Sequence, residues 1–68
     1  MVNRVTQANR PEIASYITHR FNEISARNAG RIGLVSMWDV QFEIEEKWGI
    51  SATQSQHLTW AAAGIWHG

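Results

Sequence analysis

Few residues of this 68-residue chain have the types and spacing that catalysis requires. It contains no cysteine, and its three histidines are too widely spaced to share a metal ion. The only cluster of carboxylates is Glu43, Glu45 and Glu46, and such a run is typical of a solvated helix face rather than of a desolvated cleft. The sequence therefore predicts a protein that is not an enzyme, with no metal, no cofactor and no small-molecule substrate.

Residues that suggest binding lie on one side of a helix that we expect to begin at Ser51. Their spacing places polar side chains and one tryptophan on the side opposite to Leu58 and the small residues 61–64. A tryptophan exposed beside polar groups is typical of a surface that contacts another molecule. This exposed side comprises Thr53, Gln56, His57 and Trp60.

Two further helices are expected to support this one. The first should begin near Asn9, which has capping-box spacing to Glu12, and should end between Asn28 and Gly30. Between these limits apolar residues recur at helical spacing and form a single stripe. The stripe comprises Ile13, Tyr16, Ile17, Phe21 and Ile24.

The segment 37–45 has two interpretations. Apolar and polar residues alternate along it, which is the pattern of a half-buried strand. Extended to Trp48, however, the same segment also places apolar side chains on one helical stripe. Ser36 and Asp39 have capping-box spacing, and Gly49 stands where such a helix would end. We therefore predict an all-α fold with three helices, and an α+β fold with a strand at 37–45 as the alternative.

Residues 41–58 resemble the helix-turn-helix of prokaryotic DNA-binding proteins. The shared features are a glycine in the turn, an apolar residue after it, a capping serine, and apolar residues that face the core. Two positions differ, because Glu45 replaces the usual small residue at the helix crossing and Ser55 replaces a branched apolar residue. The matching residues are Ile44, Trp48, Gly49, Ile50, Ser51 and Leu58.

This resemblance implies a DNA-binding regulator whose recognition helix begins with residues 51–57. Glutamines in that helix would pair with adenine edges, and Thr53 or His57 would reach bases or phosphates. Lys47 would contact the phosphate backbone, as would arginines of the first half of the chain. The candidate site for DNA or another partner is therefore Lys47, Ser51, Thr53, Gln54, Gln56, His57 and Trp60.

Charge and aromatic content support a second hypothesis, a module for protein–protein interaction. The formal net charge is zero, whereas binding to nucleic acid depends largely on cations that neutralise phosphates. The chain has four tryptophans, of which Trp38 and Trp60 are candidates for exposed anchors. An acidic helix and the small residues 61–64 also suit a small inhibitor, adaptor or homo-oligomer. DNA and a protein partner thus remain two alternatives.

The length predicts one helical domain over residues 9–68, preceded by a flexible N-terminal arm at residues 1–8. Trp66 is expected to fold over the core as a lid. The chain has no apolar stretch of membrane-spanning length and no signal-peptide core at its N-terminus. We therefore expect a cytoplasmic protein that does not bind a membrane.

Overall fold

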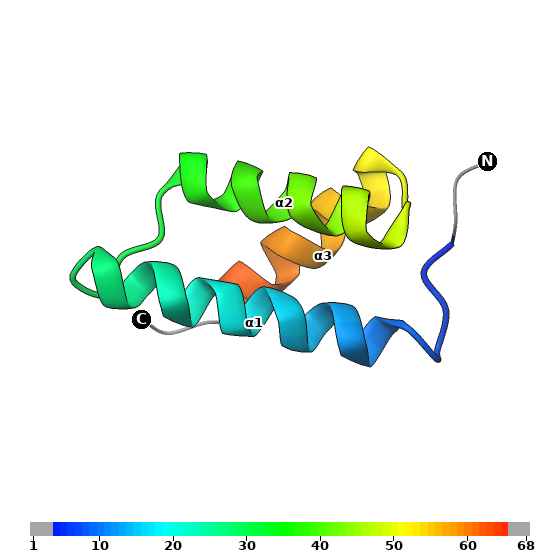
Figure 1. Cartoon of the computed structure of the whole chain (residues 1–68), viewed down its shortest axis with the longest axis horizontal. Coiled ribbons are helices and arrows are strands. Elements are labelled where there is room, and N and C mark those ends of the chain that lie inside the picture. Colours follow the sequence, from blue (N-terminus) through cyan, green and yellow to red (C-terminus); the bar gives the residue numbers. More distant parts are fainter. Residues whose placement is uncertain (1–3, 66–68) are drawn as a thin grey trace.

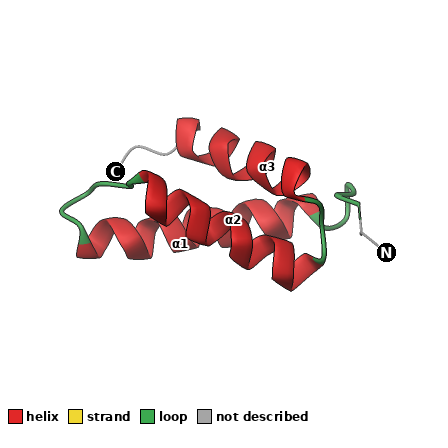
Figure 2. Cartoon of the chain, turned by 90° about the horizontal axis from the view of Figure 1, so that it is seen from above, coloured by secondary structure: helices red, strands yellow, loops and turns green. Residues whose placement is uncertain are grey.

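The computed structural model describes residues 4–65, and this range contains three helices, α1 (Arg10–Arg27), α2 (Leu34–Trp48) and α3 (Ala52–Ile65). α1 and α2 run antiparallel side by side, and α3 crosses behind them (Figure 1). Seen from above, α3 forms a second layer (Figure 2). The lid predicted at Trp66 and the first three residues of the predicted arm lie outside the described residues.

The all-α prediction is confirmed, and the strand alternative at 37–45 is wrong, because the residues described contain no strand. A strand would place alternate residues on one face. Instead Val40 and Ile44 are fully buried, whereas Trp38 and Phe42 are 42% and 57% exposed. The apolar residues of this segment therefore belong to two different sides of one helix.

The core forms where the helical stripes of α1 and α2 meet. Each stripe buries side chains spaced by about one turn, which is the spacing of neighbours on one helix face. An isoleucine of the α2–α3 turn closes the core at one end, and Val5 packs against it from the segment before α1. The buried apolar residues are Ile13, Ile17, Phe21, Val40, Ile44 and Ile50.

α1 begins where the sequence predicts, but without the predicted capping box. Asn9 is the N-cap residue, yet its side chain makes no capping hydrogen bond to the helix. Asn9 Oδ1 instead accepts a hydrogen bond from Thr6 N at 2.7 Å, and Asn9 Nδ2 donates one to Arg4 O at 3.2 Å. The asparagine thus stabilises the turn that precedes α1, and the predicted pairing with Glu12 does not form.

The two ends of α2 differ in how well they were predicted. The helix begins at Leu34 with Gly33 as its N-cap, so the prediction of Ser36 as cap is wrong. At the other end Gly49 has a left-handed conformation with φ 66°, and its N–H bonds to Glu45 O at 2.8 Å. Gly49 therefore ends α2 as predicted. None of the described helices has the length and apolar character needed to cross a bilayer.

Candidate binding surfaces

The turn between α2 and α3 consists of residues 49–51 and fixes the start of α3. Ile50 is 5% exposed and anchors the turn in the core. Ser51 Oγ accepts a hydrogen bond from Gln54 N at 3.2 Å, which satisfies one of the free N–H groups of the first turn. The predicted cap at Ser51 is therefore present.

α3 meets α2 through polar side chains, which the sequence did not suggest. Ser55 and Thr59 of α3 are fully buried, and Gln41 of α2 is 3% exposed. Ser55 Oγ donates a hydrogen bond to Glu45 Oε2 at 2.9 Å, and Gln41 Nε2 donates to the same oxygen at 3.2 Å. Thr59 Oγ1 and Gln41 Oε1 are buried without a hydrogen-bond partner. Part of the α2–α3 contact is therefore polar, and we call the buried or half-buried residues Gln41, Glu45, Ser55 and Thr59 the polar seam.

The outward side of α3 carries most of the side chains predicted there. Thr53, Gln56 and His57 are exposed. Trp60 is only partly exposed, because its ring packs edge-on against Trp38 of α2 with 5.4 Å between centroids. The structure therefore brings three polar residues together on α3 and joins Trp60 to a different group of side chains.

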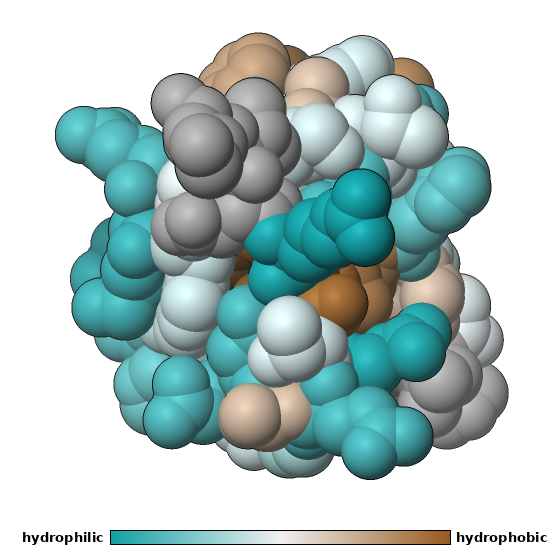
Figure 3. Space-filling view, turned by 90° about the vertical axis from the view of Figure 1, so that its right-hand side faces the viewer, coloured by the Kyte–Doolittle hydropathy of each residue, from teal (hydrophilic) through white to brown (hydrophobic). Residues whose placement is uncertain are grey.

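Gln54 and His57 face the segment that precedes α1. They line a shallow depression together with Arg10, Val5 and Leu58. Figure 3 shows this end of the molecule, where hydrophilic residues surround a small hydrophobic hollow. The depression brings a guanidinium, an amide and an imidazole close together beside the first turns of α3.

Lys47 is placed away from the other predicted site residues. Its Nζ lies 5.5 Å from the centroid of the Tyr16 ring and 5.7 Å from that of Trp48, within the range of cation–π attraction. The two rings themselves meet edge to face. Lys47 thus lies over the contact between α1 and α2 rather than beside the outward side of α3.

The acidic residues of α2 do not form one solvated face. Glu43 is held by Arg20, whose Nε and Nη2 donate to its two oxygens at 2.7 and 2.9 Å, and by Tyr16 Oη at 2.7 Å. Arg20 above all holds the pKa of Glu43 below its ordinary value, and burial raises the pKa of Tyr16. Glu45 belongs to the polar seam, so Glu46 alone of this cluster is exposed.

A group of large apolar side chains is exposed along α2. Leu34, Val35 and Phe42 are 66%, 75% and 57% exposed. Trp38 lies between them, stacked on Phe42 with 6.1 Å between ring centroids, and also contacts Trp60. Leu34 is the first residue of α2, and its side chain is turned outward. We call Leu34, Val35, Trp38, Phe42 and Trp60 the aromatic surface.

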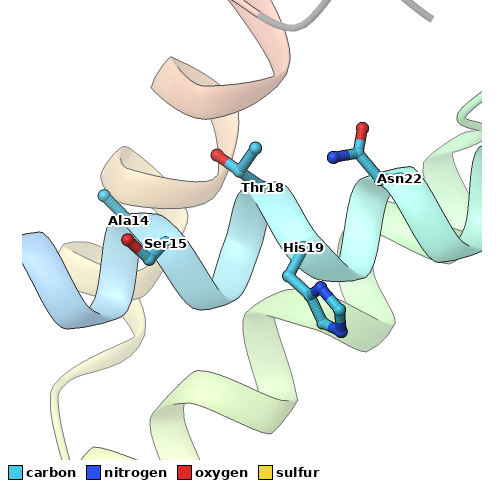
Figure 4. Close-up of a pocket in the computed structure, with 5 residues that line it drawn as sticks. All are labelled: Ala14, Ser15, Thr18, His19 and Asn22. Atoms are coloured by element: carbon cyan, nitrogen blue, oxygen red, sulfur yellow. The ribbon is translucent and has the colours of Figure 1, made fainter.

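Another depression lies on α1 and offers no comparable site. Its five lining side chains come from one helix and diverge from it (Figure 4). The residues that the structure describes include no group of three or more side chains able to hold a metal ion. The lining residues are Ala14, Ser15, Thr18, His19 and Asn22.

The fold and these surfaces define a small three-helix domain with an aromatic surface on α2 and a polar outward side on α3. Comparison with protein-family models, with curated proteins and with solved structures found no match.

Proposed function

We propose that this chain is a protein-binding module that docks its aromatic surface on a partner protein. The observation that carries the proposal is the exposure of four large apolar side chains side by side on α2, between 42% and 75% each. Soluble monomers rarely expose contiguous apolar patches larger than a few hundred Å², and larger ones mark interaction sites. Tryptophan is also the residue type most enriched among side chains that dominate binding energy.

The energetics fit reversible binding. Complete burial of an apolar side chain contributes about 1.5–3 kcal/mol, so the exposed parts of these four side chains contribute on the order of 5 kcal/mol. A partner that buries a similar apolar area adds a similar amount. Association itself costs about 4–15 kcal/mol, so the net free energy of binding depends on how well the partner fits Trp38 and Phe42.

A photo-crosslinking amino acid at position 35 tests the proposal. Val35 is the most exposed of the four side chains, and p-benzoylphenylalanine there should give a discrete covalent adduct in cells that make the protein. The matched control places the same amino acid at Thr18, which is exposed on the polar side of α1. Adducts should form at position 35 only and should disappear in Phe42→Ser. Identical adducts at both positions, or none at position 35, would refute the proposal.

A second candidate function is a helix-turn-helix DNA-binding regulator. It is supported by the three-residue turn with its left-handed Gly49 and by the capping of α3 at Ser51. Three polar side chains are exposed on the outward side of α3, where a recognition helix would contact base edges. Glu43 and Glu45 are engaged within the fold, which reduces the repulsion that an acidic helix would exert on phosphate.

Binding to random duplex DNA tests this second candidate. The affinity should fall clearly between low and moderate salt, because neutralising phosphates releases counterions. Gln56→Glu should weaken binding, whereas Thr18→Glu, which adds the same charge on α1, should have a smaller effect. Absence of binding at low salt would refute the candidate. The formal net charge of zero makes it the less favoured of the two.

A further inference from the structure

We propose that the depression between α3 and the segment before α1 is a binding site for a phosphate group. Its polar lining comes from Arg10, Gln54 and His57, and its apolar lining comes from Val5 and Leu58, which also pack against the core. None of these residues belongs to the aromatic surface, so this site is separate from the one that carries the protein-binding function. Phosphate oxygens are strong acceptors, and each of the three polar side chains has N–H groups to donate to them.

The guanidinium of Arg10 is available to an anion. No ion pair among the described residues involves Arg10, whereas Arg20 of the same helix is held by Glu43. Glu12 is the carboxylate nearest to Arg10 in the sequence, and two positions place it about 200° around α1. It lines a different depression, beside Trp48. The lining of the proposed site contains no carboxylate, so a bound phosphate group meets no competing anion there.

α3 contributes two donor side chains and the positive end of its dipole. Gln54 and His57 are three positions apart, so they lie on one side of the helix. The first turn of α3 contains no acidic residue, and the hydroxyl of Ser51 is the neutral group that caps it. The positive partial charge at the start of α3 is therefore not neutralised by a carboxylate, and it adds to the attraction that Arg10 exerts on an anion.

The segment before α1 fixes the backbone at Arg10 before a ligand binds. Thr6 N donates a hydrogen bond to Asn9 Oδ1 at 2.7 Å, and Asn9 N donates one to Thr6 Oγ1 at 3.2 Å. Arg10 N in turn donates to Thr6 O at 2.9 Å. Because this turn is already closed, binding orders side chains rather than backbone, which lowers the entropic cost of binding.

The exposure of the donors predicts weak binding. Arg10 and His57 are exposed and remain partly hydrated in a complex, so we expect a dissociation constant in the millimolar range for inorganic phosphate. The apolar lining favours a phosphate ester over the free ion. Phenyl phosphate, whose ring covers Val5 and Leu58, should therefore bind about threefold more tightly than inorganic phosphate.

An NMR titration of the purified chain with inorganic phosphate tests the proposal. The side-chain signals of Gln54 and His57 should shift and saturate with phosphate, but not with chloride at the same ionic strength. Arg10→Gln should weaken binding about tenfold, because the bidentate donor is lost. Arg27→Gln removes the same charge from the exposed far end of α1 and should change the affinity less than about twofold. A circular dichroism spectrum with helical minima shows that each variant is folded. Shifts that do not saturate, or equal weakening by the two variants, would overturn the proposal.

Phenyl phosphate and a short duplex DNA distinguish two sources of the phosphate group. If the duplex shifts the same signals and Arg10→Gln lowers its affinity, the site takes a backbone phosphate, which supports the second candidate function. Saturable binding of phenyl phosphate without binding of the duplex assigns the site to a small phosphate ester. The crosslink at position 35 does not involve this site, so the protein-binding function stands or fails separately. Absence of a response to inorganic phosphate, phenyl phosphate and duplex alike would overturn the phosphate site.

Discussion

Ser55 of α3 donates a hydrogen bond to Glu45 of α2, with 2.9 Å between Ser55 Oγ and Glu45 Oε2. These are the two positions at which the sequence departs from the helix-turn-helix pattern, and the structure shows that one departure complements the other. A buried hydroxyl requires an acceptor, and a half-buried carboxylate requires donors. The crossing of α2 and α3 is therefore held by a polar contact where a small and a branched apolar residue would otherwise pack.

This relationship predicts strong coupling between the two positions. Ser55→Ala should lower the free energy of unfolding by about 1–2 kcal/mol, because Glu45 loses a donor while remaining half-buried. Glu45→Ala combined with Ser55→Val installs the small and branched apolar pair that is usual in helix-turn-helix proteins. The double variant should lose less free energy of unfolding than the sum of the losses of the two single variants. Urea unfolding followed by circular dichroism compares the wild type with Ser55→Ala, with the single variants Glu45→Ala and Ser55→Val, and with the double variant. Ser15→Ala, exposed on α1, is the control, and additive effects would contradict the prediction.

The contact between Arg20 and Glu43 predicts how stability depends on pH. Arg20, and to a smaller extent Tyr16, holds the pKa of Glu43 below its ordinary value. A carboxyl group with a lowered pKa in the folded state stabilises the fold above its unfolded pKa, and this contribution is lost as pH falls through the folded pKa. The free energy of unfolding should therefore decrease below about pH 4.5.

The Glu43→Gln variant should lack the part of the decrease in the free energy of unfolding at low pH that comes from Glu43. Its free energy of unfolding at neutral pH should be lower than that of the wild type by about 1–2 kcal/mol, since a charge-assisted contact is lost. The difference between the two proteins should shrink as the pH is lowered. Glu46→Gln removes an exposed carboxylate of the same helix and should keep the wild-type dependence on pH. Parallel curves for Glu43→Gln and the wild type would contradict the assignment.

The three helices follow from the sequence because the apolar stripes of α1 and α2 repeat every turn and because Gly49 ends α2. The strand alternative arose because hydrophobicity alone does not distinguish Trp38 and Phe42, which are exposed, from Val40 and Ile44, which are buried. That distinction depends on which side of α2 is covered by α1 and α3. It is therefore a property of the packed helices and not of the segment.

The binding surfaces were predicted less completely for a related reason. Polar residues are normally assigned to the surface. Ser55 is buried nonetheless, because Glu45 supplies an acceptor ten residues before it, and Thr59 is buried although its hydroxyl has no hydrogen-bond partner. Trp38 and Trp60 were recognised as anchors separately, and only the structure shows that their rings touch. Such contacts join residues that no local pattern relates.

Two glycines that border α2 should respond to substitution in opposite ways. Gly49 has φ 66°, so Gly49→Ala should lower the free energy of unfolding by about 1 kcal/mol through backbone strain. Gly33 is the N-cap in an extended conformation, and a Cβ there meets nothing within 4 Å. Gly33→Ser should raise the free energy of unfolding by about 0.5 kcal/mol, because its hydroxyl can accept a hydrogen bond from the first turn. Thermal unfolding compares both variants with the wild type, and two shifts of the same sign would contradict this account.

Two phenylalanines provide a matched test of which apolar residues hold the fold and which serve binding. Phe21 is fully buried, so Phe21→Ala should lower the free energy of unfolding by about 3–5 kcal/mol. This loss approaches the whole stability of a domain of this size. Phe42 is 57% exposed, so the Phe42→Ala variant should keep a helical circular dichroism spectrum. Its free energy of unfolding should fall by about 1 kcal/mol or less. Urea unfolding measures the first difference, and the yield of the crosslink from position 35 measures binding. Phe42→Ala should reduce that yield while the protein stays folded. If Phe42→Ala unfolds the chain as Phe21→Ala does, then Phe42 belongs to the core and not to the aromatic surface.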